Sequence, residues 1–449
     1  MQKLVSFARR KLGRLLRRPA SSAAFVVTTG FLLLLTAQPT LSMSIDAQVR
    51  LLGGFQPRAA DMSDPAVQAI LASPGWKKAA ETSSLAAVLR DGATLPKLRG
   101  DRRRKWTGDS PRQTLFSPTS RKQMAEFFAS NLGEAGTGTR KLLYLFGGPD
   151  VLYPHLLFPN LEDLVLVGLE QPGQVFSPER LADTKKLEPM MGRIAKAYNS
   201  LMRMSYFITT AMASELTEFG TSTMIAVGLA ANDFEITAVE PVAIEPSGEL
   251  RATAERSNGV RVRFRKPSGQ QGSVSYFRMD LSDQNLARNP AFTRFLEQTR
   301  FDTAFYKAAS FVSSSRNFDG LNRFVISQVK HVVQADDGLP LRAFKDTAQN
   351  WRLRLYGHYT VPHKQFGTNG HQSDLRTTTA AALCRTASKE DRDLWVKLWK
   401  DGCKGEPPYG FAAVDWVGPV PFRYGYAAIS GPNVADADRF STLMIFDKK

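Results

Sequence analysis

Two glycines and two acids follow the two most apolar runs of the chain, and their types and spacing could form a ligand site. Residues 142–146 (LLYLF) lead into a Gly-Gly-Pro-Asp turn, and residues 164–169 lead into an acid 24 positions after the first run. Glycine admits backbone angles closed to other residues, and dinucleotide folds place a ribose-binding acid at a similar spacing. The pattern predicts a nucleotide or cofactor crevice built from Gly147, Gly148, Asp150 and Glu170.

A second interpretation of the same residues requires no ligand. The segment contains no G-x-G-x-x-G motif, and Pro149 lacks the N–H group that a phosphate cradle would use. In this interpretation the glycines form a tight turn and Glu170 is a strand-end acid that faces water. The sequence leaves both interpretations open.

The elements around these residues predict the fold class. Both apolar runs have the length of strands covered on two faces, and residues 150–158 between them are typical of a short helix that begins after a proline. A parallel pair joined by a helix is the unit of doubly wound sheets, whose ligands lie outside the carboxyl ends of the strands. We therefore expect an α/β body at residues 141–376, with a mixed, partly parallel sheet and flanking helices.

This segment resembles a family of uncharacterised secreted or periplasmic bacterial proteins. Their pattern is F-x-G-G-P-D, an aromatic residue and F-P-N, and then G-L-E-P; here Gln171 separates the acid from Pro172. The resemblance implies a shared fold unit and a secreted setting, and it supplies no chemistry. The matching residues are Phe146, Gly147, Gly148, Pro149, Asp150, Tyr153, Phe158, Pro159, Asn160, Gly168, Leu169 and Glu170.

An enzyme at this edge would need a nearby base or nucleophile, and three residues are candidates. Lys307 lies within an apolar run, residues 304–312, that predicts a strand. A lysine there is either an edge residue that points to water or a buried, partnered ammonium, and a structural role is the favoured interpretation. Asp280 and His358 are the other candidates.

Three histidines and an acid form the one cluster that could hold a metal. Zinc accepts both residue types and needs only three protein ligands in a catalytic site. The spacing H-x₄-H-x₇-H matches no established motif, so a loop without metal is the favoured alternative. The predicted ligands are His358, His363, His371 and Asp374.

The first 44 residues predict export. Seven Lys and Arg precede an uncharged apolar stretch at residues 20–37, which is the pattern of a signal peptide or of an uncleaved anchor in the inner membrane. Without this leader the net charge falls from +17 to +10. A basic exported protein favours anionic lipid, acidic glycan or an envelope protein as partners over nucleic acid, and solubility alone is the competing explanation.

The two cysteines agree with an exported chain. Cys384 and Cys403 lie 19 positions apart without a Cys-x-x-Cys motif, so we expect a disulfide in an oxidising compartment. We also expect a helical region with a basic linker at residues 45–140 and a C-terminal subdomain at residues 377–449.

The function predicted from these observations is that of an exported binding or envelope-associated protein, periplasmic or secreted. No catalytic set can be assembled from spacing alone. The alternative is an enzyme that uses the crevice near the Gly-Gly-Pro-Asp turn, with a cofactor that the sequence does not identify.

Overall fold

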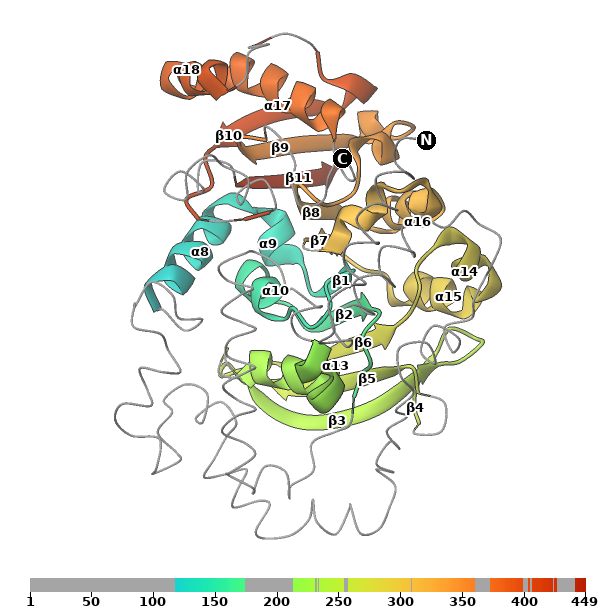
Figure 1. Ribbon diagram of the computed structural model, residues 1–449. Coiled ribbons are helices and arrows are strands. Elements are labelled where there is room, and N and C mark those ends of the chain that lie inside the picture. Colours follow the sequence, from blue (N-terminus) through green and yellow to red (C-terminus); the bar gives the residue numbers. More distant parts are fainter. Residues whose placement is uncertain are drawn as a thin grey trace, which may run out of the picture. The chain divides into compact units, whose positions relative to one another are not determined.

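The computed structural model describes residues 118–173, 213–230, 232, 234–253, 257–307, 309–359, 372–398, 403, 406–422, 424–425 and 441–449. All of these residues belong to one compact unit, which lies within residues 58–449 (Figure 1). The predicted leader and most of the predicted helical region lie outside the described residues.

A mixed sheet of eleven strands forms the centre of this unit, in the order β10-β9-β11-β8-β7-β1-β2-β6-β5-β3-β4. The five strands from β8 to β6 are mutually parallel. Strand β11 runs antiparallel between β8 and β9, while β5, β3 and β4 extend the other side as an antiparallel meander. The strands are β1 Lys141–Leu145, β2 Asp163–Gly168, β3 Glu235–Ile244, β4 Leu250–Ala252, β5 Gly259–Arg265, β6 Gln271–Arg278, β7 Thr303–Tyr306, β8 His331–Ala335, β9 Trp351–Gly357, β10 Ala413–Gly418 and β11 Thr442–Lys448.

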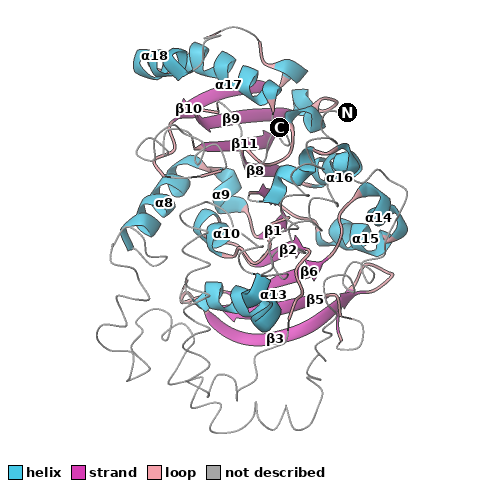
Figure 2. Ribbon diagram, viewed as in Figure 1, coloured by secondary structure: helices cyan, strands magenta, loops and turns pink. Residues whose placement is uncertain are grey.

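Helices cover both faces of the sheet (Figure 2). Alternate residues of β1 enter two separate cores, since Leu142 and Tyr144 pack on one face and Leu143 and Leu145 on the other. The first face is covered by α8 Pro118–Asn131, α9 Glu134–Gly138, α10 Leu152–Leu157 and α13 Ala213–Ala230. The second is covered by α14 Asp283–Arg288, α15 Pro290–Thr299, α16 Asp319–Gln328, α17 Ser373–Thr386 and α18 Lys389–Leu398. The predicted α/β class with a mixed, partly parallel sheet is confirmed.

Two predicted elements have different bounds in the structure. The strand expected at residues 304–312 ends at Tyr306, and a 3-10 helix follows at Ala309–Ser314. The apolar spacing of residues 318–333 predicts one helix, but α16 ends at Gln328 and His331–Ala335 form strand β8. All of β8 is buried and paired with β7 and β11. Ladder pairing in the sheet therefore outweighs the helical period of this segment.

The predicted C-terminal subdomain shares the sheet of the body. Strands β10 and β11 pair with β9 and β8, so the boundary expected at residue 377 separates elements of one sheet. Cys384 on α17 forms a disulfide with Cys403, with Cα atoms 5.6 Å apart. This confirms the predicted pair.

Among the described residues, no helix has the length and apolar character required to cross a bilayer. The predicted anchor at residues 20–37 lies outside them.

Candidate functional site at the carboxyl edge of the sheet

The order of the parallel strands places a switch point between β1 and β7. The chain proceeds from β1 to β2 and β6 on one side, and then returns to place β7 and β8 on the other side of β1. In doubly wound sheets, ligands bind in the crevice outside the carboxyl ends of the strands at such a point. Five predicted residues, namely Gly147, Gly148, Asp150, Glu170 and Lys307, lie at this edge together with several unpredicted ones.

The turn after β1 has an unusual backbone. Phe146 has a φ of 62°, which is an outlier for a bulky side chain and costs on the order of 1–3 kcal/mol. A Cβ on Gly147 would lie 2.7 Å from the ring of Tyr144, so only glycine lets this tyrosine pack beneath the turn. Gly148 is buried and has a φ of 55°, which favours glycine, and no atom of the described residues lies within 4 Å of the position that its Cβ would take.

Asp150 and Lys307 form a fully buried ion pair across the switch point. The Nζ of Lys307 lies 3.7 Å from the Oδ2 of Asp150, and both side chains are fully buried. Burial lowers the pKa of Lys307 to about 8 and raises the pKa of Asp150, while the attraction between the two charges opposes both shifts. Lys307 directly follows β7, which is an inner strand of the sheet, so its side chain does not point to water from a sheet edge. Of the two interpretations of Lys307, the buried, partnered ammonium is the one observed.

Three tyrosines surround this pair. Tyr144 donates its hydroxyl hydrogen to the Oδ2 of Asp150 at 3.1 Å. The ammonium of Lys307 lies 3.6 Å from the ring centre of Tyr153 and 6.0 Å from that of Tyr424, within the range of cation–π attraction. The hydroxyl of Tyr424 has no hydrogen-bond partner among the described residues. Tyr424 is 274 positions from Asp150 in the chain, and no local pattern connects the two residues.

Two further acids follow β8 at the same edge. Asp336 and Asp337 are 4% exposed and lie in a turn, which the Asp-Asp-Gly sequence predicts and which the N–H of Gly338 closes by donating to the carbonyl of Ala335. Their charges help to raise the pKa of Tyr424, after burial and Tyr153. The acids and the tyrosine therefore lie within electrostatic range of one another.

Glu170 lies past the end of β2 and is held in a bent conformation. Its Oε2 accepts the N–H of Leu169 at 3.1 Å and the hydroxyl of Tyr276 at 3.2 Å. A Cβ on Gly168 would lie 2.5 Å from this oxygen, so a side chain there would displace the carboxylate from its position. Glu170 is partly exposed, and Leu169 beside it is 68% exposed. Both of these hydrogen bonds reach the same carboxylate oxygen.

The two other candidate bases do not join this cluster. Asp280 follows β6, where its Oδ1 accepts the N–H of Ser282 in a turn. His358 follows β9 and packs between two indole rings, with ring centres 6.3 Å from Trp395 and 5.6 Å from Trp416. Of the three candidates, Lys307 alone contacts the Gly-Gly-Pro-Asp turn.

The predicted metal ligands fall partly outside the described residues, since His363 and His371 are not among them. Asp374 accepts the hydroxyl of Tyr409 at 3.1 Å. Within the described part of the chain, no three His, Cys, Asp or Glu side chains are grouped so that they could hold a metal ion. The four-residue metal site stays a prediction.

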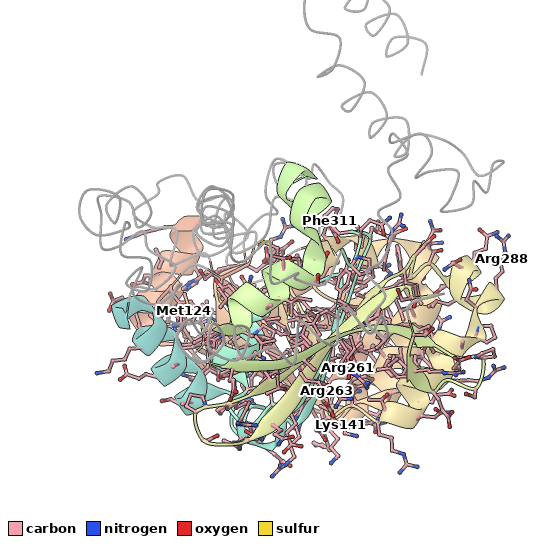
Figure 3. The ribbon with its side chains drawn as sticks, turned by 90° about the horizontal axis from the view of Figure 1, so that it is seen from below. Met124, Lys141, Arg261, Arg263, Arg288 and Phe311 are labelled. Atoms are coloured by element: carbon pink, nitrogen blue, oxygen red, sulfur yellow. A yellow bond between two sulfur atoms is a disulfide. The ribbon has the colours of Figure 1, made fainter. Side chains whose placement is uncertain are left out.

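Apolar residues alternate with arginines along residues 260–265, which predicts a strand with one cationic face. Strand β5 has this face, and acids partly neutralise it. Figure 3 labels Arg261 and Arg263 on this strand. Both guanidinium groups contact Glu240, and Arg265 contacts Glu235 at 3.1 Å. This face is therefore less basic than its sequence suggests.

Comparisons with known proteins add little to this description. No protein-family model matches the chain, and no curated protein sequence matches it. Among solved structures, it is similar to an uncharacterised protein from Burkholderia thailandensis at 11% identity, with 84% of this chain and 94% of that chain covered and a TM-score of 0.17. A TM-score of this size does not establish a shared fold.

Proposed function

We propose that this chain is an enzyme of the α/β class that binds a nucleoside-containing cofactor at the carboxyl edge of its sheet. The observation that carries the proposal is the placement of the Gly-Gly-Pro-Asp turn at the switch point, with Glu170 one strand away. This is where a doubly wound sheet binds its ligand and where an acid can accept ribose hydroxyls. The strained Phe146 and the buried ionisable pair beside it are features that concentrate at functional sites.

Each element of the edge has a role in this proposal. Glu170 accepts a ribose hydroxyl through its second oxygen, and Leu169 offers an exposed apolar contact for the base. Gly148 allows the close approach of a ligand to the turn, since it has no side chain and no side chain of the described residues lies within 4 Å of its Cβ position. Lys307 and Asp150 fix the ends of β7 and β1 relative to one another.

Adenosine titrations of the wild type and of Glu170→Gln test this proposal. We expect adenosine to raise the melting temperature of the wild type and to bind Glu170→Gln about ten-fold more weakly, since one ribose contact of roughly 1.4 kcal/mol is lost. Glu126→Gln on the exposed face of α8 is the matched control and is expected to bind like the wild type. Absence of any adenosine binding, or equal binding by all three proteins, contradicts the proposal.

An exported envelope protein is the second candidate, and the disulfide between Cys384 and Cys403 favours it. The basic and then apolar leader at residues 1–44 supports the same compartment. Its proposed partners are anionic lipid, acidic glycan or an envelope protein. Nucleoside cofactors are made in the cytosol, so the compartment of the chain separates the two candidates.

Fractionation of the native host tests the second candidate. Mass spectrometry of the chain from each fraction is expected to find an oxidised cysteine pair in the envelope fraction. Recovery of a reduced chain from the cytosol contradicts export and leaves the cofactor proposal in place.

A further inference from the structure

We infer that Phe146 is a specificity-determining residue whose ring stacks on the planar base of the nucleoside, with Phe318 and Leu169 completing an apolar wall. The carboxyl edge then binds a purine nucleoside more tightly than a pyrimidine nucleoside, and it does not bind ribose alone. This inference rests on the proposed function, because it names the part of the ligand that the same edge recognises.

The strained backbone at the end of β1 is not explained by the turn alone. Three non-glycine residues among those described have a positive φ, and two of them belong to a helix end or a short 3-10 segment. These are Arg300, which caps α15 in the left-handed conformation, and Tyr409. Phe146, with a φ of 62°, instead follows a parallel strand directly. Glycine or asparagine would adopt this angle with less strain, so the turn by itself does not account for the phenyl ring.

The ring of Phe146 lies partly at the surface of the carboxyl edge. Phe146 is half-buried, and its buried part packs against the core that contains Leu143 and Leu145. Its neighbour is Phe318, which is also half-buried, with ring centres 5.5 Å apart and an interplanar angle of 87°. This edge-to-face arrangement is one that aromatic pairs prefer. Two oriented aromatic rings, each with part of its surface in solvent, therefore lie beside the Gly-Gly-Pro-Asp turn.

Leu169 gives the neighbouring strand end the same apolar character. It is the most exposed large apolar side chain among the described residues, at 68%. Its backbone is held on both sides, because its N–H donates to Glu170 and its carbonyl accepts the Nε–H of Arg278 at 3.0 Å. A single exposed leucine needs no explanation by itself. Here it lies one strand away from two partly exposed aromatic rings, and contiguous apolar surface at a strand edge marks a ligand site.

The register of β1 and β2 brings these side chains to one place. Leu145 pairs with Val167, so Phe146 and Leu169 follow strand ends that are one strand spacing, about 5 Å, apart. Val167 lies in the same core as the buried part of Phe146, and the alternation along β2 assigns Leu169 to that side. Glu170 comes next, where the proposed function places the ribose. A base attached to this ribose therefore reaches the apolar wall.

Aromatic and aliphatic side chains recognise a base through its faces. Stacking is favoured by dispersion and by the exclusion of water, and both contributions grow with the area in contact. A purine has two fused rings and a pyrimidine has one, while ribose has no planar face. Stacking is also tolerant of the hydrogen-bonding pattern of the base. The wall therefore selects its ligand by the area of the ring system.

Calorimetric titration of the full chain with adenosine, uridine and D-ribose tests the inference. We expect the wild type to bind adenosine about ten-fold tighter than uridine and to show no binding of ribose at the same concentrations. Phe146→Leu keeps an apolar side chain at the strained position and removes the ring, so it should bind adenosine about ten-fold more weakly. Phe146→Tyr restores the ring and should recover most of the lost affinity.

Phe127→Leu is the matched control for these variants. Phe127 is a half-buried phenylalanine of α8, and its ring also makes an edge-to-face contact, at 5.3 Å from the ring centre of Phe422. Because α8 is not part of the carboxyl edge, this variant is expected to bind adenosine like the wild type. A loss equal to that of Phe146→Leu would mean that any phenylalanine exchange lowers affinity through the fold, and it would contradict the inference.

The remaining outcomes separate the inference from the proposed function. If Phe146→Leu binds adenosine as tightly as the wild type while Glu170→Gln is weakened, the inference is wrong and the nucleoside site stands. If uridine or ribose binds the wild type as tightly as adenosine, the ring area is not recognised and the inference is also wrong. If adenosine does not bind the wild type, the proposed function fails and the inference fails with it. The wild-type titrations decide among these outcomes even if Phe146→Leu does not fold.

Discussion

Two aspartates at opposite edges of the sheet have opposite pKa shifts. At the carboxyl edge, burial raises the pKa of Asp150 in spite of Lys307. At the amino edge, burial acts on Asp447 in the same sense, but the hydrogen bond from His331 and the charge of Arg354 outweigh it and lower the pKa. Ionised Asp447 at the amino edge therefore stabilises the fold, whereas the burial of ionised Asp150 at the carboxyl edge lowers the stability.

The hydrogen bonds at the amino edge explain this difference. Asp302 accepts the N–H groups of Arg140 and Lys141 at 3.0 and 2.9 Å. Arg354 donates to Asp447 at 2.8 Å and also to the carbonyls of Asn131 and Leu132. These charged groups find several partners each, and they are partly hydrated.

The carboxyl edge instead combines a strained residue, a fully buried ion pair and an unpaired hydroxyl. Local features that lower the stability of the fold are expected at functional sites. The two edges of one sheet therefore have different roles: the amino edge stabilises the fold, and the carboxyl edge carries the candidate site.

The largest expected effect is the loss of one partner of the buried pair. Asp150→Asn and Lys307→Met should each lower the free energy of unfolding by about 3–5 kcal/mol, because the remaining charge is buried without compensation. Urea unfolding at pH 7 measures both.

The double variant Asp150→Asn/Lys307→Met provides the control. It should cost less than the sum of the single changes, since no charge is left unpaired. Additive losses would mean that the two side chains are not coupled, and the cost assigned to this edge would then have another origin.

A buried histidine that belongs to neither edge sets the acid response of the fold. His155 on α10 packs against Phe234 and Phe264, and burial followed by the charge of Lys266 lowers its pKa to about 3. The unfolded chain binds this proton near pH 6.5, so stability is lost as the pH falls from 6.5 towards 3. The expected loss between pH 7 and pH 4 is on the order of 3 kcal/mol.

His155→Leu should remove this slope, and unfolding measured at a series of pH values will detect the change. The same slope in the variant and in the wild type would assign the acid response to other groups. Once the contribution of His155 is removed, the pH dependence of stability that arises at each edge can be compared directly.

Asp447→Asn tests the amino edge in the same way. We expect a loss of roughly 2 kcal/mol at pH 7, because hydrogen bonds from charged groups to the carboxylate are weakened. Since the pKa of Asp447 is lowered in the folded state, this contribution is present above the usual carboxyl pKa and is lost as the pH falls through the folded value.

The contribution of Asp150 to stability should depend on pH in the opposite sense. Because the pKa of Asp150 is raised in the folded state, this contribution is greatest in acid and becomes smaller as the pH rises through the folded value. The pH dependence of each variant relative to the wild type measures both signs. Equal signs at the two edges would remove the contrast between them.

Much of the fold could be predicted from the sequence because it depends on local patterns. The apolar runs before Gly147 and Glu170 predicted β1 and β2, and the alternation along β5 predicted one buried and one charged face. Strand β8 could not be predicted, because its residues continue the helical spacing of the segment before it. They form a strand because they pair with β7 and β11, and β11 comes from a distant part of the chain.

The site could be predicted only in part for the same reason. Gly148, Asp150 and Glu170 follow strands that are recognisable on their own, so their common edge followed from topology. The contact between Asp150 and Lys307 spans 157 positions, and no local rule brings Tyr424 to it. Burial and pairing of this kind arise from tertiary packing and leave no periodic signal.

The smallest expected effect concerns the hydroxyl of Tyr424. Tyr424→Phe should leave the free energy of unfolding unchanged or raise it by up to about 1 kcal/mol, since the lost hydroxyl is buried without a partner among the described residues. Tyr356→Phe is the matched control, because the hydroxyl of Tyr356 donates to the carbonyl of Asn131 at 3.2 Å and its loss should cost about 1 kcal/mol. Urea unfolding of both variants without added ligand makes the comparison. Equal losses would mean that the hydroxyl of Tyr424 is as well paired as that of Tyr356, and the carboxyl edge would then lack its clearest unpaired group.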